Sequence, residues 1–287
     1  KLKEIRSRII YTLLMLVVVR IGTQLPVPGV NGSYFSEWFS GNSGSAFGFF
    51  DAITGGSFEK MSVFALNITP YITSSIIIQL LTIAIPKLEE LQKDGEEGRK
   101  KMTAITRYLT VALALMESLA MAIGFGRSGL LIKFNALNVI TAVVTLTAGS
   151  TVIMWIGERI TENGVGNGIS IVLTINIISR IPQDLTLLFE QFVKGKEIAF
   201  QVLNLAIIIA IIIIVTVLTV ALQGAERRIP VQYSRKVQGR KQVGGQTSHI
   251  PLKVNTAGVI PIIFAQSLFM FPLIIMQLLG KSGGNGI

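Results

Sequence analysis

Three glycines alternate with other residues at Gly164, Gly166 and Gly168, and glycines spaced in this way can cradle a phosphate group. A phosphate-binding loop would also carry a lysine and follow a strand, and this stretch has neither sequence feature. The pattern instead favours a tight turn that returns the chain to a membrane. Asn167 and Ser170 would then help to satisfy backbone groups at the break.

Residues that act as acids, bases or metal ligands are scarce. The chain has one histidine, His249, and no cysteine, which excludes a multi-histidine metal site, thiolate chemistry and disulfides. An intramembrane protease needs a Ser–His pair, paired aspartates or an HExxH motif, but His249 lies in a loop and no apolar run carries two aspartates. Glu117 lies in an apolar run without a second carboxylate for a proton relay, and Arg20 lies near the end of another run, where it can reach the interface. The sequence therefore predicts no enzyme, no catalytic residue, no metal site and no cofactor.

The stretch 47–85 combines a short apolar piece, a break at Gly55 and Gly56, and a longer apolar run that starts at residue 61. The first piece is too short to span a bilayer, and the second carries more polar groups than a helix facing only lipid would tolerate. The pattern predicts a helix that enters the membrane, breaks, and lines something other than lipid. Ile68, Ile72 and Ile76 share one face of that helix, and periodicity favours a core over a narrow hydrophobic constriction.

The elements that must position these residues are membrane spans. Half of the residues are apolar and only 15% are charged, whereas soluble domains are nearer a quarter charged, so the chain is an integral membrane protein. A span needs about 20 largely apolar residues. The fifth candidate is the shortest, and it can extend through residue 188. The seven candidate spans are 9–25, 61–85, 108–125, 136–156, 169–181, 203–222 and 257–279.

Lysine and arginine are concentrated in alternate loops, which accounts for the net charge of +10 and predicts a cytoplasmic N-terminus. On the opposite side, 31–45 is rich in Gly, Ser and Asn, and we expect a flexible loop there. The cytoplasmic loop 223–253 has seven basic residues and one acidic residue. Its alternating pattern around Ile229 and Val231, followed by glycines, predicts an arm of β-hairpin character. Repeated basic pairs in it favour a large anionic partner, either RNA phosphates or an acidic protein face.

Five stretches resemble the SecY family, the channel subunit of the Sec protein-translocation machinery. They are QLPVPG (24–29), FALNITPYI (64–72), SIIIQLL (75–81), GVGNGISI (164–171) and HIPLKVNTAGVIPIIF (249–264). Asn67 stands where the family often has glycine, and Leu173 stands where it often has isoleucine.

The resemblance implies an all-α, polytopic transmembrane helix bundle with a broken second span and a long basic cytoplasmic loop. The family has ten spans, and this sequence would hold the first seven. They divide into an N-terminal half, 1–181, and the start of the C-terminal half, 198–287, while the last three spans would be absent.

The resemblance also implies roles for individual residues. The family's pore is closed by an aliphatic ring, which here would be Ile68, Ile72, Ile169, Leu173 and Ile263. A plug over 47–58 would include Phe49, Phe50, Asp51, Ala52, Ile53, Thr54, Gly55 and Gly56. A lateral gate would use Thr73, Ser74, Gln79, Asn255, Thr256 and Gln266. Partner docking would use Arg227, Arg228, Arg240 and Lys241.

The function that the resemblance implies is a protein-conducting channel in the bacterial cell (inner) membrane, which translocates unfolded secretory polypeptides and releases hydrophobic segments sideways into the bilayer. The implied partners are the SecE and SecG subunits, the SecA motor ATPase, the ribosome with its rRNA, signal peptides and nascent chains, and the lipid bilayer, but not DNA. The alternative is a secondary transporter with broken helices, which should show well-placed charged or polar groups at the membrane midplane. The aliphatic neck, and the lack of a substrate carboxylate clamp in these spans, favour the channel.

Overall fold

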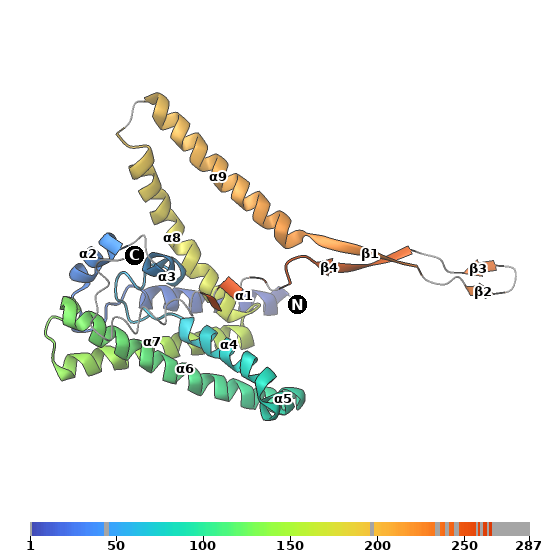
Figure 1. Ribbon diagram of the computed structural model, residues 1–287, viewed down its shortest axis with the longest axis horizontal. Coiled ribbons are helices and arrows are strands. Elements are labelled where there is room, and N and C mark those ends of the chain that lie inside the picture. The colour runs from blue at the N-terminus through green and yellow to red at the C-terminus, as the bar shows by residue number, and fades with distance from the viewer. Residues whose placement is uncertain are drawn as a thin grey trace. The chain divides into compact units, whose positions relative to one another are not determined.

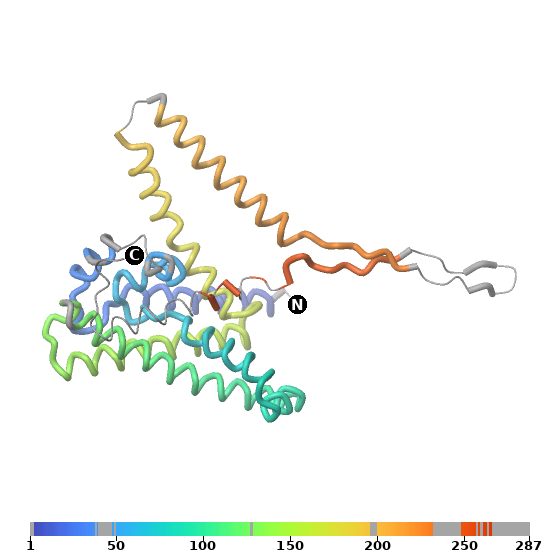
Figure 2. Tube along the Cα trace, in the orientation of Figure 1, coloured from blue at the N-terminus to red at the C-terminus, as the bar shows by residue number. Residues whose placement is uncertain are grey.

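The computed structural model describes residues 2–42, 46–195, 198–232, 236–238, 241–243, 247–256, 258, 261–262 and 264–265 (Figures 1 and 2). The chain divides into a first compact unit that runs to Pro182 and a second unit, Gln183–Ile262. Apart from short strands, the regular structure of the described residues is helical, which confirms the predicted all-α class.

The first unit is built from helices that follow one another along the chain, joined by turns. Its last helix, α8, continues past Pro182 into the second unit. The helices are α1 (Leu2–Gly22), α2 (Gly32–Asn42), α3 (Ala46–Thr54), α4 (Thr69–Ala84), α5 (Pro86–Lys93), α6 (Gly95–Phe125), the π-helical turn η1 (Gly126–Leu130), α7 (Ala136–Asn163) and α8 (Gly168–Phe192).

The second unit holds the rest of α8, the apolar helix α9 (Ile198–Gly224) and a hairpin (Figure 1). Strand β1 (Glu226–Gln232) pairs antiparallel with β4 (Thr247–Lys253), in a register that sets Ile229 opposite Ile250. The short strands β2 (Lys236–Gln238) and β3 (Lys241–Val243) pair in the same way. The hairpin character predicted for 223–253 is therefore confirmed.

Among the described residues, α6, α7, α8 and α9 are long and apolar enough to cross a membrane, and the bent pair α4–α5 makes a fifth candidate. α8 extends well beyond the predicted 169–181, so the weak fifth candidate is a full-length helix of 25 residues. The predicted run 257–279 lies almost wholly outside the described residues.

The second predicted span, 61–85, is helical over only part of its length. Residues 61–68 form turns, and α4 starts at Thr69 with Pro70 in its first turn. A proline suits that position because the first N–H groups of a helix have no partner within the helix. Asn67 has a φ of 51° and lies in the left-handed region. Asparagine tolerates this backbone conformation better than most residues, and glycine adopts it without strain.

α4 and α5 meet at an angle of 105°. Ile85, between them, has an extended backbone with φ −114° and ψ 110°. Proline disfavours the helical region for the residue before it, so Pro86 accounts for the break.

A buried aromatic cluster shows that the expectation of a flexible loop at 31–45 is wrong over α2. Phe35 and Phe39 lie one helical turn apart and are both buried. The ring of Phe58 lies edge-on to Phe35 at 5.3 Å between centroids and to Phe50 at 5.1 Å. The burial of this pair stabilises the helix despite the glycine and serine content of the segment.

α6 packs closely along α7 through small and hydroxyl side chains. Ser118 and Thr147 are hydrogen-bonded at 2.9 Å. On another side of α7, a Cβ atom at Gly149 would lie 1.9 Å from the carbonyl oxygen of Val63 in the turn before α4, so only glycine fits there. In a membrane the hydrophobic effect does not drive helices together, so small residues that let them pack closely become important.

Candidate pore constriction and plug

Four of the five residues expected to form the pore ring lie in one apolar cluster, called here the constriction cluster. Ile68 is fully buried, and Ile72, Ile169 and Leu173 are partly buried and pack against the same core. The fifth, Ile263, lies outside the described residues. The buried members of the cluster come from three helices (α1, α7 and α8) and the turn before α4, and they are Val19, Phe64, Ile68, Ile153, Ile156, Ile160 and Val172.

Glycines on α7 and α8 bring these aliphatic side chains together. A Cβ atom at Gly168 would lie 2.0 Å from the carbonyl oxygen of Gly157, so the start of α8 touches the backbone of α7. A Cβ atom at Gly157 would lie 3.2 Å from Ile169 and 3.5 Å from Ile68. Gly157 and Gly168 therefore serve close helix approach beside the predicted ring.

The turn between α7 and α8 is held by side chains, as the sequence predicts. Asn167 accepts hydrogen bonds from the backbone N–H groups of Ile169 at 3.1 Å and Ser170 at 3.3 Å, so it caps α8. The hydroxyl of Thr12 in α1 accepts from the backbone N–H of Val165 at 3.2 Å. These bonds fix the entry of α8, which carries two of the expected ring residues.

The predicted plug residues form α3 and the turn after it. Asp51 and Thr54 are buried, and Phe50 packs in the aromatic cluster, while the side chain of Phe49 is not described. Gly55 and Gly56 have φ values of 71° and 79°, the left-handed conformation that ends many helices. The backbone N–H of Glu59 donates to the Asp51 carboxylate at 2.8 Å, so the segment is folded back on itself.

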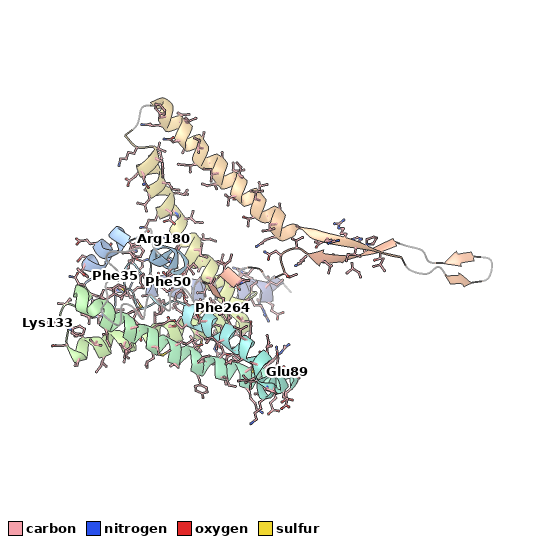
Figure 3. The ribbon with its side chains drawn as sticks, in the orientation of Figure 1. Phe35, Phe50, Glu89, Lys133, Arg180 and Phe264 are labelled. Atoms are coloured by element: carbon pink, nitrogen blue, oxygen red, sulfur yellow. The ribbon has the colours of Figure 1, made fainter. Side chains whose placement is uncertain are left out.

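Sequence reasoning missed the partners of the plug on α8. Arg180 forms an ion pair with Asp51, and Figure 3 labels Arg180 on α8 and Phe50 on α3. The side-chain amide of Asn176 donates to that of Asn67 at 3.2 Å. The available signal was the four-residue spacing of Val172, Asn176 and Arg180, which places them on one helical face.

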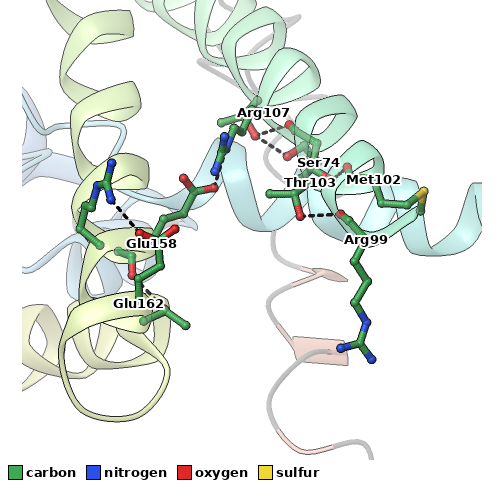
Figure 4. A network of polar contacts seen from close by, with 12 residues as sticks. Ser74, Arg99, Met102, Thr103, Arg107, Glu158 and Glu162 are labelled. Carbon is green, nitrogen blue, oxygen red and sulfur yellow. Dashed lines mark hydrogen bonds and ion pairs between the residues drawn. The ribbon is translucent and has the colours of Figure 1, made fainter. Parts of the chain in front are cut away.

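The residues expected at the lateral gate lie in different settings. The hydroxyl of Ser74, labelled in Figure 4, is buried and lies 2.6 Å from that of Thr110 in α6. Gln79 is exposed. In the second unit, Asn255 accepts a hydrogen bond from the backbone N–H of Gly258 at 3.0 Å, and Thr256 is exposed. Thr73 is partly buried, and Gln266 lies outside the described residues. The role of this group stays a prediction.

A polar network joins α6 to α7 near the expected gate residues (Figure 4). Arg107 donates from Nε to the Glu158 carboxylate at 2.9 Å, and the Glu158 side chain is only 15% exposed. Arg159 pairs with Glu162 at 2.8 Å on the exposed side of α7. Within the described ranges, no three histidine, aspartate or glutamate side chains gather closely enough to hold a metal ion.

Two of the expected docking residues, Arg227 and Arg228, are exposed on β1. Arg240 lies outside the described residues, and Lys241 is described only as backbone of β3. The hairpin therefore presents basic side chains, and its role in docking stays a prediction.

Comparison with known proteins gives a consistent assignment. The SecY family model matches residues 62–286. The chain is 41% identical over 285 residues to the protein translocase subunit SecY of Pseudomonas aeruginosa, covering 99% of this chain and 64% of that protein. It is 40% identical over 289 residues to the Escherichia coli subunit, with the same two coverages. The chain thus spans about two thirds of the length of the curated relatives that it matches.

Solved structures show the same fold. A protein-conducting channel matches with a TM-score of 0.63 at 20% identity, over 97% of this chain and 60% of that one. Sec61 from a canine ribosome–channel complex matches with the same values. The all-helical fold, the multi-pass apolar helices and the matched length together show that the chain belongs to the SecY family.

Proposed function

We propose that this chain forms the first part of a protein-conducting channel, which translocates unfolded secretory polypeptides and releases hydrophobic segments sideways into the bilayer. The observation that carries the proposal is the constriction cluster, in which Ile68, Ile72, Ile169 and Leu173 meet beside a packed plug segment. Aliphatic side chains exclude water from a narrow constriction and so hinder the passage of ions. They also offer no fixed hydrogen bonds, so they would not select the sequence of the passing polypeptide.

In this proposal the remaining parts act around the neck. Residues 47–58 seal the closed channel, and Ile263 completes this chain's share of the ring. The polar residues Thr73, Ser74 and Gln79 of α4, with Asn255, Thr256 and Gln266, form weak and reversible contacts at a lateral gate. The support is family membership together with the buried position of α3.

The channel has no catalytic chemistry of its own and draws energy from partners. We propose the SecE and SecG subunits, the SecA ATPase, and the ribosome as partners, with signal peptides and nascent chains as substrates. The N-terminus then lies in the cytoplasm of a bacterial cell, and the hairpin with Arg227, Arg228, Arg240 and Lys241 docks the partner. The exposed arginines of β1 support this role, and Sec61 in a ribosome–channel complex has the same fold.

The constriction is tested by ion conductance of the full-length channel in planar bilayers. Ile68→Asn and Ile72→Asn place an amide in the neck, where water would follow it, so the closed-state conductance should rise severalfold. Ile83→Asn is the matched control, because Ile83 lies on the same helix but is 83% exposed. Conductance that stays at the wild-type level in both neck variants would remove the proposed ring.

A further inference from the structure

The plug segment and α8 are joined by a buried ion pair. Asp51 is fully buried, and the Arg180 side chain is only 13% exposed. Two more groups support the pair, since the backbone N–H of Glu59 donates to Asp51 at 2.8 Å and the Glu59 carboxylate lies 4.0 Å from Arg180. A charge that is removed from water in this way is costly when its partner is taken away. The ion pair is therefore expected to break only when water or another polar group can reach Asp51 and Arg180.

A second polar contact lies one turn earlier on α8. Asn176, fully buried, donates to the side-chain oxygen of Asn67 at 3.2 Å. Asn67 in turn donates to the backbone carbonyl of Ile53, in α3, at 3.4 Å, and its own carbonyl accepts from Ser150 of α7 at 3.1 Å. Asn67 therefore links the plug helix to both α7 and α8.

The backbones also touch between these two polar contacts. A Cβ atom at Gly55 would lie 2.6 Å from the carbonyl oxygen of Asn176, and Gly55 itself has a φ of 71°. The turn that ends α3 is thus seated directly on the backbone of α8. Only glycine satisfies both the conformation and the space.

We propose that Asn176 and Arg180 of α8 form a latch that holds the plug segment in the closed position, through Asn67 and Asp51. The inference rests on the proposed sealing role of 47–58. The same helix carries Ile169 and Leu173 of the constriction cluster, so a shift of α8 that widens the neck also strains the latch. Because the contacts are polar and localised, they break over a short displacement, whereas the aromatic packing of Phe50 and Phe58 loosens gradually.

The test uses the full-length channel in proteoliposomes and measures two things. The first is ion leak without substrate. The second is the rate at which a thiol reagent added outside modifies Ala52→Cys, which has no competing thiol within these 287 residues. Asp51→Asn and Arg180→Gln should each raise both the leak and the modification rate by about tenfold or more, which corresponds to a shift of about 1.4 kcal/mol in the closed–open equilibrium. The double variant should leak less than the product of the two single effects, since it buries no unpaired charge.

Three further variants separate a latch from a general packing role. Arg180→Lys keeps the charge and should stay close to wild type. Lys60→Gln removes a charge at an exposed site two residues after the plug segment and should change neither the leak nor the modification rate. Asn67→Gly removes the amide link while glycine takes the φ of 51° without strain, so it should fold and still raise the thiol modification rate. A merely structural role would lower transport and the amount of folded channel together, whereas a released latch leaves transport intact.

The outcomes distinguish the latch from the proposed function on which it rests. Wild-type leak and modification rates in Asp51→Asn, Arg180→Gln and Asn67→Gly, with a leaky deletion of residues 52–57, would overturn the latch and retain the plug. A tight seal in the deletion itself would overturn the sealing role of 47–58. If the charge variants fail to accumulate, Asn67→Gly decides alone, and a wild-type modification rate in it overturns the latch.

Discussion

At the scale of single residues, glycines and one asparagine determine how closely several segments pack and how they are linked. Gly168 and Gly149 allow backbones to approach to distances that a methyl group would prevent. Asn67 adopts a left-handed conformation, its side chain links α3 to α8, and its backbone carbonyl accepts a hydrogen bond from α7. Substitutions at these positions therefore act by steric exclusion or by loss of a defined polar link, rather than by a change in hydrophobicity.

Gly149→Ala tests the steric part of this view. The new methyl group would meet the carbonyl oxygen of Val63, so the turn before α4 would have to move away from α7. Overpacking of this kind costs about 1–3 kcal/mol, and the Tm of the purified full-length protein should fall. Gly32→Ala is the control, because nothing lies within 4 Å of its added methyl group. Equal Tm values for the two variants would contradict the close approach.

At the scale of elements, α8 is the helix on which the site depends, and its start is set by one side chain. Asn167→Ala would remove the oxygen that accepts from Ile169 and Ser170, at a cost of about 1 kcal/mol. Asn167→Asp keeps an acceptor and should retain the wild-type Tm. Thermal unfolding of both variants checks the cap, and an unchanged Tm in Asn167→Ala would show that the glycine contacts with α7 hold the turn without it.

The elements also show what the sequence predicts and where prediction ends. Apolar runs and basic loops predict spans and a hairpin, because hydropathy and alternation are local properties. The start of α4 at Thr69 and the helix at α2 were missed, since Asn67 and the pair Phe35 and Phe39 act through contacts that hydropathy does not report. The ion pair between Asp51 and Arg180 joins positions far apart in the chain, and nothing local at Arg180 indicates a carboxylate partner.

At the scale of the whole molecule, the chain supplies about two thirds of a SecY relative and leaves large apolar surfaces uncovered. No residue in the most apolar window of α9 is buried. In a membrane protein such a helix faces lipid or neighbouring helices, and the relatives' extra length provides candidates for the latter. Conduction and sealing should therefore be measured on the full-length protein.

The hairpin in the second unit has two chemically different faces. Side chains alternate along a strand, and residues directly opposite share a face. One face carries Ile229, Ile250 and Leu252, which are 42%, 53% and 48% exposed, together with Arg227. The other carries Arg228 and Lys253, together with His249 and with Glu226, which lies opposite Lys253. This second face has two cations and no large aliphatic side chain among the paired positions, so an anionic partner should dock on it.

This asymmetry makes adjacent arginines matched controls for each other. Arg228→Glu should weaken binding of the full-length channel to the ribosome or to SecA by about tenfold at low salt, because it reverses a charge on the proposed docking face. Arg227→Glu, one residue away on the apolar face, should have a clearly smaller effect. If the partner surface is RNA, the loss of one phosphate contact also reduces the slope of log affinity against log salt by about 0.7–0.9, while an acidic protein face gives no such fixed slope. Equal losses in the two variants would show that docking does not distinguish the faces, and full affinity in both would remove β1 from the docking surface.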